Sequence, residues 1–136
     1  MNPQRTIILI GLVNLTLLGF LTPLLDGELL AAQDPLFFSW PGVLIIALWG
    51  LAYMAAAPVW QQLPGLMLVF AAEKLLFDVR WIVWMTENRD RLPALFEEDV
   101  MVALFYSGYG VWDGACALFF LFLFFRARQA GAAATA

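Results

Sequence analysis

Five ionisable side chains lie inside long apolar stretches of this chain: Glu73, Lys74, Asp78, Arg80 and Asp113. Carboxylates, amines and guanidinium groups can exchange protons, pair with one another or hold an ionic ligand. In an apolar surrounding they are costly unless they are paired or serve a function. Three acids and two bases leave one negative charge over. We interpret this surplus as favouring a functional polar pocket over a purely structural network.

The spacing of these residues predicts one polar and aromatic face on the helix that carries four of them. At about 100° per residue, two neighbouring lines of that face hold Glu73, Phe77, Arg80 and Trp84, and Lys74, Asp78 and Trp81. Lys74 and Asp78 are also spaced to bridge within the helix. A matching stripe on the last helix holds Tyr106, Tyr109 and Asp113.

Depth along the helices predicts how these side chains group. Counted from the helix midpoints, one buried network would contain Asn14, Glu73, Lys74 and Asp113. An outer layer would contain Asp78, Arg80, Tyr106 and Tyr109, with Trp81 and Trp84 as the aromatic lining of a cavity. We expect Asp113 and Lys74 to be energetically coupled.

The composition places these charges in a membrane protein. Of the 136 residues, 63% are hydrophobic and 13% are charged, with a mean hydropathy of +0.83. Soluble domains are about half apolar and a quarter charged. The net charge of −4 excludes the basic surface that nucleic acid requires. With no histidine and one cysteine, Cys116, we expect no metal site and no cofactor.

Four apolar stretches are each long enough to cross a hydrocarbon core of about 30 Å. They predict spans over 6–25, 40–60, 64–85 and 100–125. Helices satisfy their own backbone in lipid, so the expected fold is all-α: an integral membrane four-transmembrane-helix bundle with up-down topology. We expect one domain over 1–129 and a disordered tail over 130–136.

An even number of spans places both termini on one side of the membrane. Arg5, Arg126 and Arg128 lie on that side, against Arg89 and Arg91 on the other. This bias predicts that both termini are cytoplasmic, in a multi-pass protein of a bacterial-type inner (plasma) membrane.

The longer connections carry two further signals. The apolar residues 36–38 and Trp40 predict an aromatic patch at headgroup level. Glu97, Glu98 and Asp99 precede the last span, where carboxylates suit a helix N-terminus.

Two comparisons with known membrane families bear on function. The run Glu73-x4-Asp78-x-Arg80-Trp81 resembles a segment of the emopamil-binding-type sterol isomerases. This chain departs from their site in having no histidine, so no activity is carried over. Small multidrug transporters also have four short spans, but their characteristic acid lies in the first span, which has no carboxylate here.

Three functions fit these features, with the lipid bilayer as the common surrounding. We rank first a protein without chemistry, whose polar core binds an amphipathic small molecule or docks a membrane subunit. The alternative is a proton- or cation-coupled transporter that acts as a homodimer and titrates Glu73 or Asp113. The second alternative is an enzyme acting on a lipid or quinone-like substrate. It would use a carboxylate as acid/base, with Arg80 or Lys74 steadying an anion.

Overall fold

The chain is all-helical, as expected, and this computed structural model describes residues 2–19 and 26–134 without a strand among them. The helices, with η for 3-10 turns, are α1 (Pro3–Gly19), α2 (Gly27–Gln33), α3 (Pro35–Phe38), α4 (Trp40–Ala56), η1 (Ala57–Gln62), α5 (Pro64–Asn88), η2 (Arg89–Arg91), α6 (Leu92–Glu98) and α7 (Val100–Ala134).

Proline and aspartate mark several helix boundaries. Pro41 and Pro64 lie in the first turns of α4 and α5, where a missing N–H breaks no helical hydrogen bond. Pro58 lies in η1, just after α4 ends. The Asp99 carboxylate accepts hydrogen bonds from two backbone N–H groups of α7, at 2.8 and 2.9 Å, and so caps that helix.

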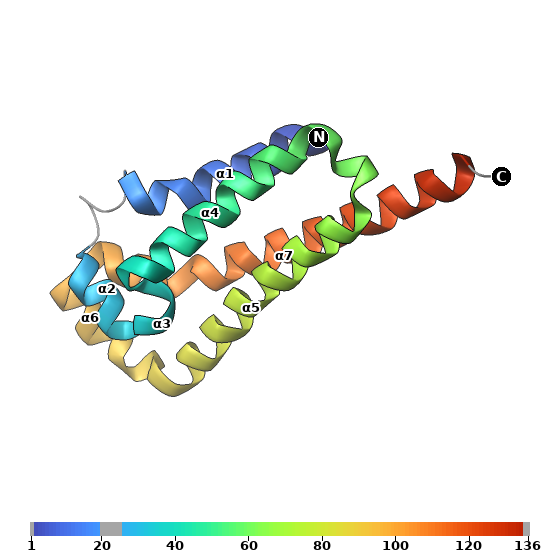
Figure 1. Cartoon of the computed structure of the whole chain (residues 1–136). Coiled ribbons are helices and arrows are strands. Elements are labelled where there is room, and N and C mark those ends of the chain that lie inside the picture. Colours follow the sequence, from blue (N-terminus) through green and yellow to red (C-terminus); the bar gives the residue numbers. More distant parts are fainter. Residues whose placement is uncertain (1, 20–25, 135–136) are drawn as a thin grey trace.

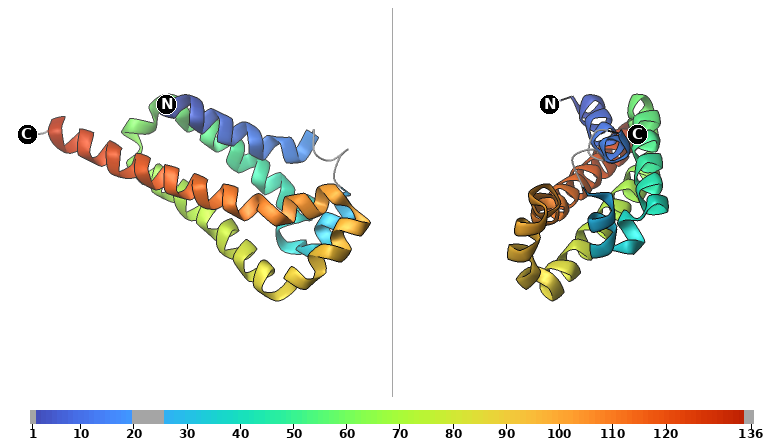
Figure 2. Two further views of the ribbon diagram at one scale, coloured as in Figure 1. Left: turned by 180° about the vertical axis from the view of Figure 1, so that it is seen from behind. Right: turned by 90° about the vertical axis from the view of Figure 1, so that its left-hand side faces the viewer.

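The four long helices form two antiparallel pairs, α1 with α4 and α5 with α7 (Figure 1). The pairs lie close together near η1 and diverge toward the opposite end, where α2, α3 and α6 lie (Figures 1 and 2). Both described ends of the chain are on the η1 side (Figure 1). Each pair is therefore a packed unit, and the space between the pairs is filled by side chains and the short helices.

Glycines let the paired helices approach each other. A Cβ added at Gly11 of α1 or at Gly50 of α4 would lie 2.6 Å from the other residue's carbonyl oxygen. A Cβ added at Gly110 of α7 would lie 2.2 Å from the Trp81 ring of α5. These three positions have no room for a larger residue, which explains the absence of a side chain there.

A polar layer divides the hydrophobic core into two clusters. The cluster near η1 includes Tyr53, Phe70 and Phe120, and the cluster at the diverging end includes Phe77 and Tyr106. Between them lie the buried polar residues Asn14, Glu73, Lys74 and Asp113, which we call the mid-bundle polar layer. Three long helices contribute to this layer, so it lies where the two pairs face each other.

Two helical segments are long and apolar enough to cross a membrane among the described residues. They are Trp40–Gln62, which joins α4 to η1, and Val100–Gly131 of α7. The apolar part of α1, Pro3–Leu17, is shorter, and α5 carries four charged residues in its middle. The expected end of the first span, over 20–25, lies outside the described residues.

The last helix extends into the stretch 130–136 that the sequence predicts to be a disordered tail. Helix α7 continues to Ala134, so 130–134 are helical rather than irregular, and only 135–136 fall outside the described residues. Alanine has the highest helix propensity of all residues, which accounts for the extension of the helix through this alanine-rich stretch.

Candidate functional site

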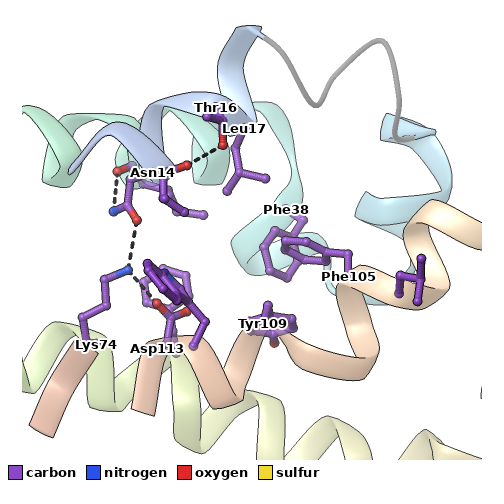
Figure 3. Close-up of a pocket in the computed structure, with 13 residues that line it drawn as sticks. Asn14, Thr16, Leu17, Phe38, Lys74, Phe105, Tyr109 and Asp113 are labelled. Atoms are coloured by element: carbon purple, nitrogen blue, oxygen red, sulfur yellow. Dashed lines mark hydrogen bonds and ion pairs between the residues drawn. The ribbon is translucent and has the colours of Figure 1, made fainter. Parts of the chain in front are cut away.

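Lys74 is the centre of a buried hydrogen-bond network that joins the two helix pairs (Figure 3). Its Nζ donates to Asp113 Oδ1 at 2.6 Å and to Asn14 Oδ1 at 3.0 Å. The Asn14 amide nitrogen in turn donates to the Ile46 carbonyl oxygen at 3.2 Å. Lys74 on α5 is thus connected to α7 by an ion pair and to α1 by a hydrogen bond to the Asn14 side chain. Asn14 connects α1 to α4 by its hydrogen bond to the backbone.

This network is electrically neutral, because it contains one ammonium and one carboxylate. The Lys74 side chain is 3% exposed and that of Asp113 is 10% exposed. A buried ion pair is stable only when both charges stay paired and hydrogen-bonded, a condition that the Lys74 contacts meet.

A cavity of about 240 Å³ lies against this network, between α1 and α7; we call it the α1/α7 cavity (Figure 3). Its polar residues include Asn14, Lys74, Asp113 and Tyr109. Its remaining walls are mostly apolar: Val13, Leu17, Phe38, Ile46, Phe77, Leu104, Phe105 and Trp112. Leu104 and Trp112 are also exposed on the outside of α7, so the cavity meets the bundle surface there.

Phe38 forms one wall of the α1/α7 cavity, which corrects the expected surface patch. Leu36 and Trp40 are exposed as expected, but Phe38 is buried between the helix pairs. Its ring makes edge-on contacts with the Tyr106 and Tyr109 rings, at centroid distances of 5.7 and 5.3 Å. The divergence of the pairs creates space for an aromatic ring, and α3 supplies it.

Tyr109 lines the α1/α7 cavity and has a hydroxyl group without a hydrogen-bond partner among the described residues. The residue is 9% exposed, and its OH has no hydrogen-bond partner within the part of the chain that the structure describes. One turn away, the Tyr106 OH donates to the Leu30 carbonyl oxygen at 3.1 Å. Buried hydroxyls are almost always paired. Tyr109 thus lines the cavity and carries a buried hydroxyl whose hydrogen-bonding capacity is unused among the described residues.

Glu73 is apart from the Lys74 network, although the sequence placed both in one group. The Tyr53 OH donates to Glu73 Oε2. Its other carboxylate oxygen, Oε1, has no hydrogen-bond partner among the described residues. Glu73 and Lys74 are consecutive on α5, so their side chains point about 100° apart and reach different neighbours.

Tyr53 is a site residue that the sequence reasoning missed. It has the only hydroxyl in the predicted span 40–60, a signal that could have marked it. In the sequence, Tyr53 lies among apolar residues of the predicted span, so its aromatic ring looked like one more apolar side chain.

Arg80 of the expected outer layer pairs with a residue that the sequence did not single out. Its Nε donates to Asp34 Oδ2 at 2.6 Å, and Asp34 is only 1% exposed. Asp34 immediately precedes α3, so this pair anchors to α5 the segment that carries Phe38. A carboxylate in a connecting loop gave no indication in the sequence that it would be buried.

Asp78 does not bridge to Lys74, contrary to the spacing within the helix. Lys74 reaches Asp113 and Asn14, and no bond joins it to Asp78 among the described residues. Asp78 lies against Gly114 of α7, where an added Cβ would be 3.2 Å from its carboxylate. Partners on other helices were nearer for Lys74 than the partner on its own helix.

Trp81 and Trp84 pack between α5 and α7 and do not line the α1/α7 cavity. The Trp81 Nε1 donates to the Tyr106 carbonyl oxygen at 2.7 Å. The Trp84 ring lies 4.4 Å from the Tyr106 ring. The aromatic lining of the α1/α7 cavity comes instead from residues of α3, α5 and α7.

Comparisons with known proteins give no function for these residues, so their geometry is the basis for interpreting them. No protein-family model, no curated protein and no solved structure matches the chain. Within residues 2–19 and 26–134, no group of three or more histidine, cysteine, aspartate or glutamate side chains is placed to hold a metal ion. The arrangement therefore offers hydrogen bonds and apolar contacts to a bound molecule.

Proposed function

We propose that this chain is a multi-pass membrane protein that binds a neutral amphipathic molecule in the α1/α7 cavity. In this proposal α1, α4, α5 and α7 all span the bilayer, although only two helical segments meet the length and hydropathy criteria.

The outward faces of the four long helices support the membrane location. Large apolar side chains are exposed on each of them, including Leu9, Leu12, Leu44, Leu48, Leu51, Leu68, Leu75, Val79, Ile82, Val111, Leu118 and Phe122. Soluble monomers rarely expose contiguous apolar surface on this scale. Lipid would cover it without cost.

The charges of α5 fit the same location because they turn inward or find partners. Lys74 pairs with Asp113 and Arg80 with Asp34, which reduces the cost of placing them at membrane depth. Helix α1 has 17 residues and is about 26 Å long at 1.5 Å per residue, close to the hydrocarbon thickness of about 30 Å.

The proposed orientation has both termini in the cytoplasm, from the arginine bias described above. The single cysteine, Cys116, is buried, so cysteines placed at exposed sites can be labelled with little background. We expect a membrane-impermeant maleimide added outside cells to label Ala94→Cys and not Gln129→Cys. The reverse pattern would invert the orientation, and labelling of both in intact cells would contradict the four-span topology.

The observation that carries the binding function is a cavity with apolar walls and a neutral polar end. Ligand sites are typically apolar with a few placed polar groups. Because Lys74 and Asp113 already neutralise each other, an ionic ligand would meet no net opposite charge. The Tyr109 OH and the Asn14–Lys74–Asp113 group suit a single hydroxyl or carbonyl. We therefore infer a membrane-dissolved molecule with an apolar body and one such group.

Native mass spectrometry of the protein extracted in native lipid nanodiscs tests this function. Leu104→Trp places a bulky side chain where the cavity meets the surface. Leu118→Trp is the matched control, because Leu118 is exposed on the same helix and does not line the cavity. We expect a small molecule bound to the wild type and to Leu118→Trp, and lost from Leu104→Trp. Equal retention in both variants, or a co-purifying subunit in place of a small molecule, would overturn the proposal.

A further inference from the structure

A second cavity lies on the other side of the mid-bundle polar layer, between α4 and α5. It has a volume of about 490 Å³, and we call it the α4/α5 groove. Phe37, Trp49 and Phe77 supply its aromatic lining, and among the described residues that line it Glu73 is the one with a charge. Phe77 lines the α1/α7 cavity as well, so its ring separates the two spaces.

The groove reaches the bundle surface through apolar residues. Ile45 of α4 and Val69 and Leu76 of α5 line it and are each about half-exposed. In the proposed membrane location these residues face lipid, so a molecule dissolved in the bilayer can enter sideways between the two helices.

At its polar end the groove holds a carboxylate with unused hydrogen-bonding capacity. Glu73 is 8% exposed, and Tyr53 donates to one of its oxygens. The other oxygen, Oε1, has no donor, and Glu73 forms no ion pair in the part of the chain that the structure describes. The adjacent cation, Lys74, is committed to Asp113 and Asn14. A buried carboxylate is stabilised by a hydrogen bond to its free oxygen and by a compensating positive charge. A positively charged donor supplies both.

We propose that the α4/α5 groove is a second binding site, for a cationic amphipath that enters from the lipid. The ammonium of a hydrophobic primary amine donates to Glu73 Oε1, and its apolar chain follows Ile45, Val69 and Leu76 outward. Trp49 and Phe77 line the same groove as Glu73, and aromatic faces attract cations. The site does not depend on the α1/α7 cavity, whose polar end is neutral.

Equilibrium binding of radiolabelled decylamine to the full chain in zwitterionic lipid nanodiscs, corrected for empty nanodiscs, tests this site. Decanol is the neutral probe of equal chain length. We expect the wild type to bind decylamine at least about tenfold more tightly than decanol, since a charge-assisted hydrogen bond replaces a neutral one. Glu73→Gln removes the charge with little change of shape and should abolish that preference. Equal binding of the two probes by the wild type, or unchanged amine binding by Glu73→Gln, would overturn the proposal.

A second pair of variants tests the same site without touching Glu73. Ala72 is exposed and lines the groove, whereas Ala115 is exposed on α7 and lines neither cavity. Ala72→Trp should weaken decylamine binding at least about tenfold and Ala115→Trp should leave it unchanged. Equal affinity in the two variants would overturn the proposal even if Glu73→Gln failed to fold. Leu104→Trp should bind decylamine like the wild type, so failure of the α1/α7 function is distinguishable from failure of this site.

Discussion

The α1/α7 cavity and the α4/α5 groove each contain a carboxylate buried between helices, but the two carboxylates have different partners. Asp113 at the first has an ammonium at 2.6 Å, whereas Glu73 at the second has a tyrosine hydroxyl and forms no ion pair among the described residues. The difference arises because Glu73 and Lys74, which are consecutive on α5, point about 100° apart and reach different neighbours. In our proposal the Asp113 charge is structural and the Glu73 charge is available for binding.

The largest expected effect comes from separating Lys74 from Asp113. Lys74→Met should destabilise the protein by about 3–5 kcal/mol, because Asp113 is left buried without its cation. Glu73→Gln, one residue away, should cost less than about 1 kcal/mol because Tyr53 retains an acceptor. Denaturation with SDS in mixed micelles, followed by circular dichroism, measures both. Equal losses would remove the distinction between the two carboxylates.

The double variant Lys74→Met, Asp113→Leu sharpens that test. We expect it to cost at least about 1 kcal/mol less than the sum of the two single changes, since removing both partners leaves no orphaned charge. Strictly additive losses would show that the pair contributes no coupling, whatever its distance in the structure.

The next effect concerns the packing that keeps α5 and α7 in register on one side of both cavities. Gly110→Ala should cost about 3 kcal/mol, because its Cβ would overlap a Trp81 ring held by a hydrogen bond to Tyr106. Gly108→Ala is the matched control, with no atom within 4 Å of the added Cβ, and should shift stability by less than about 1 kcal/mol. A similar loss in both would place the effect in the helix backbone and not in the contact.

A smaller effect is expected from breaking the Arg80–Asp34 ion pair, which connects α5 to the segment that lines both cavities. Arg80→Met should cost about 2 kcal/mol, between the values of exposed and fully buried pairs, because Asp34 is buried and Arg80 is partly exposed. Hydrogen exchange should increase in α3, whose Phe37 lines the groove and whose Phe38 lines the cavity. Exchange confined to α5 would show that the pair does not hold α3.

The smallest effect on stability separates two tyrosines that lie one turn apart. Tyr106→Phe loses a hydrogen bond to Leu30 and should cost about 1 kcal/mol. Tyr109→Phe removes a hydroxyl that has no partner among the described residues and should cost about zero. Ligand retention in native mass spectra should change in the opposite order, with the loss confined to Tyr109→Phe. Loss of ligand in Tyr106→Phe alone would move the polar end of the site away from Tyr109.

Much of the inward face of α5 could be predicted from spacing alone. Glu73, Lys74 and Phe77 are buried there, while Leu75 and Val79 are exposed on the opposite side. Helical periodicity is a local property, so the sequence is sufficient to sort residues around one helix. The same reasoning placed Trp81 and Trp84 on that face but could not distinguish packing between helices from the lining of a cavity.

The sequence by itself determined that the chain is helical, that the charges inside its apolar stretches lie on α5 and α7, and that Asn14, Glu73, Lys74 and Asp113 lie at similar depth. Only the tertiary structure decided which charged side chains form ion pairs with each other. Lys74 pairs with Asp113, 39 residues away, and Arg80 with Asp34, 46 residues away, in preference to an acid on the same helix. Such choices depend on the distance and rotation between helices, which are set by contacts such as Gly11 against Gly50. Spacing within a single helix contains no information about them.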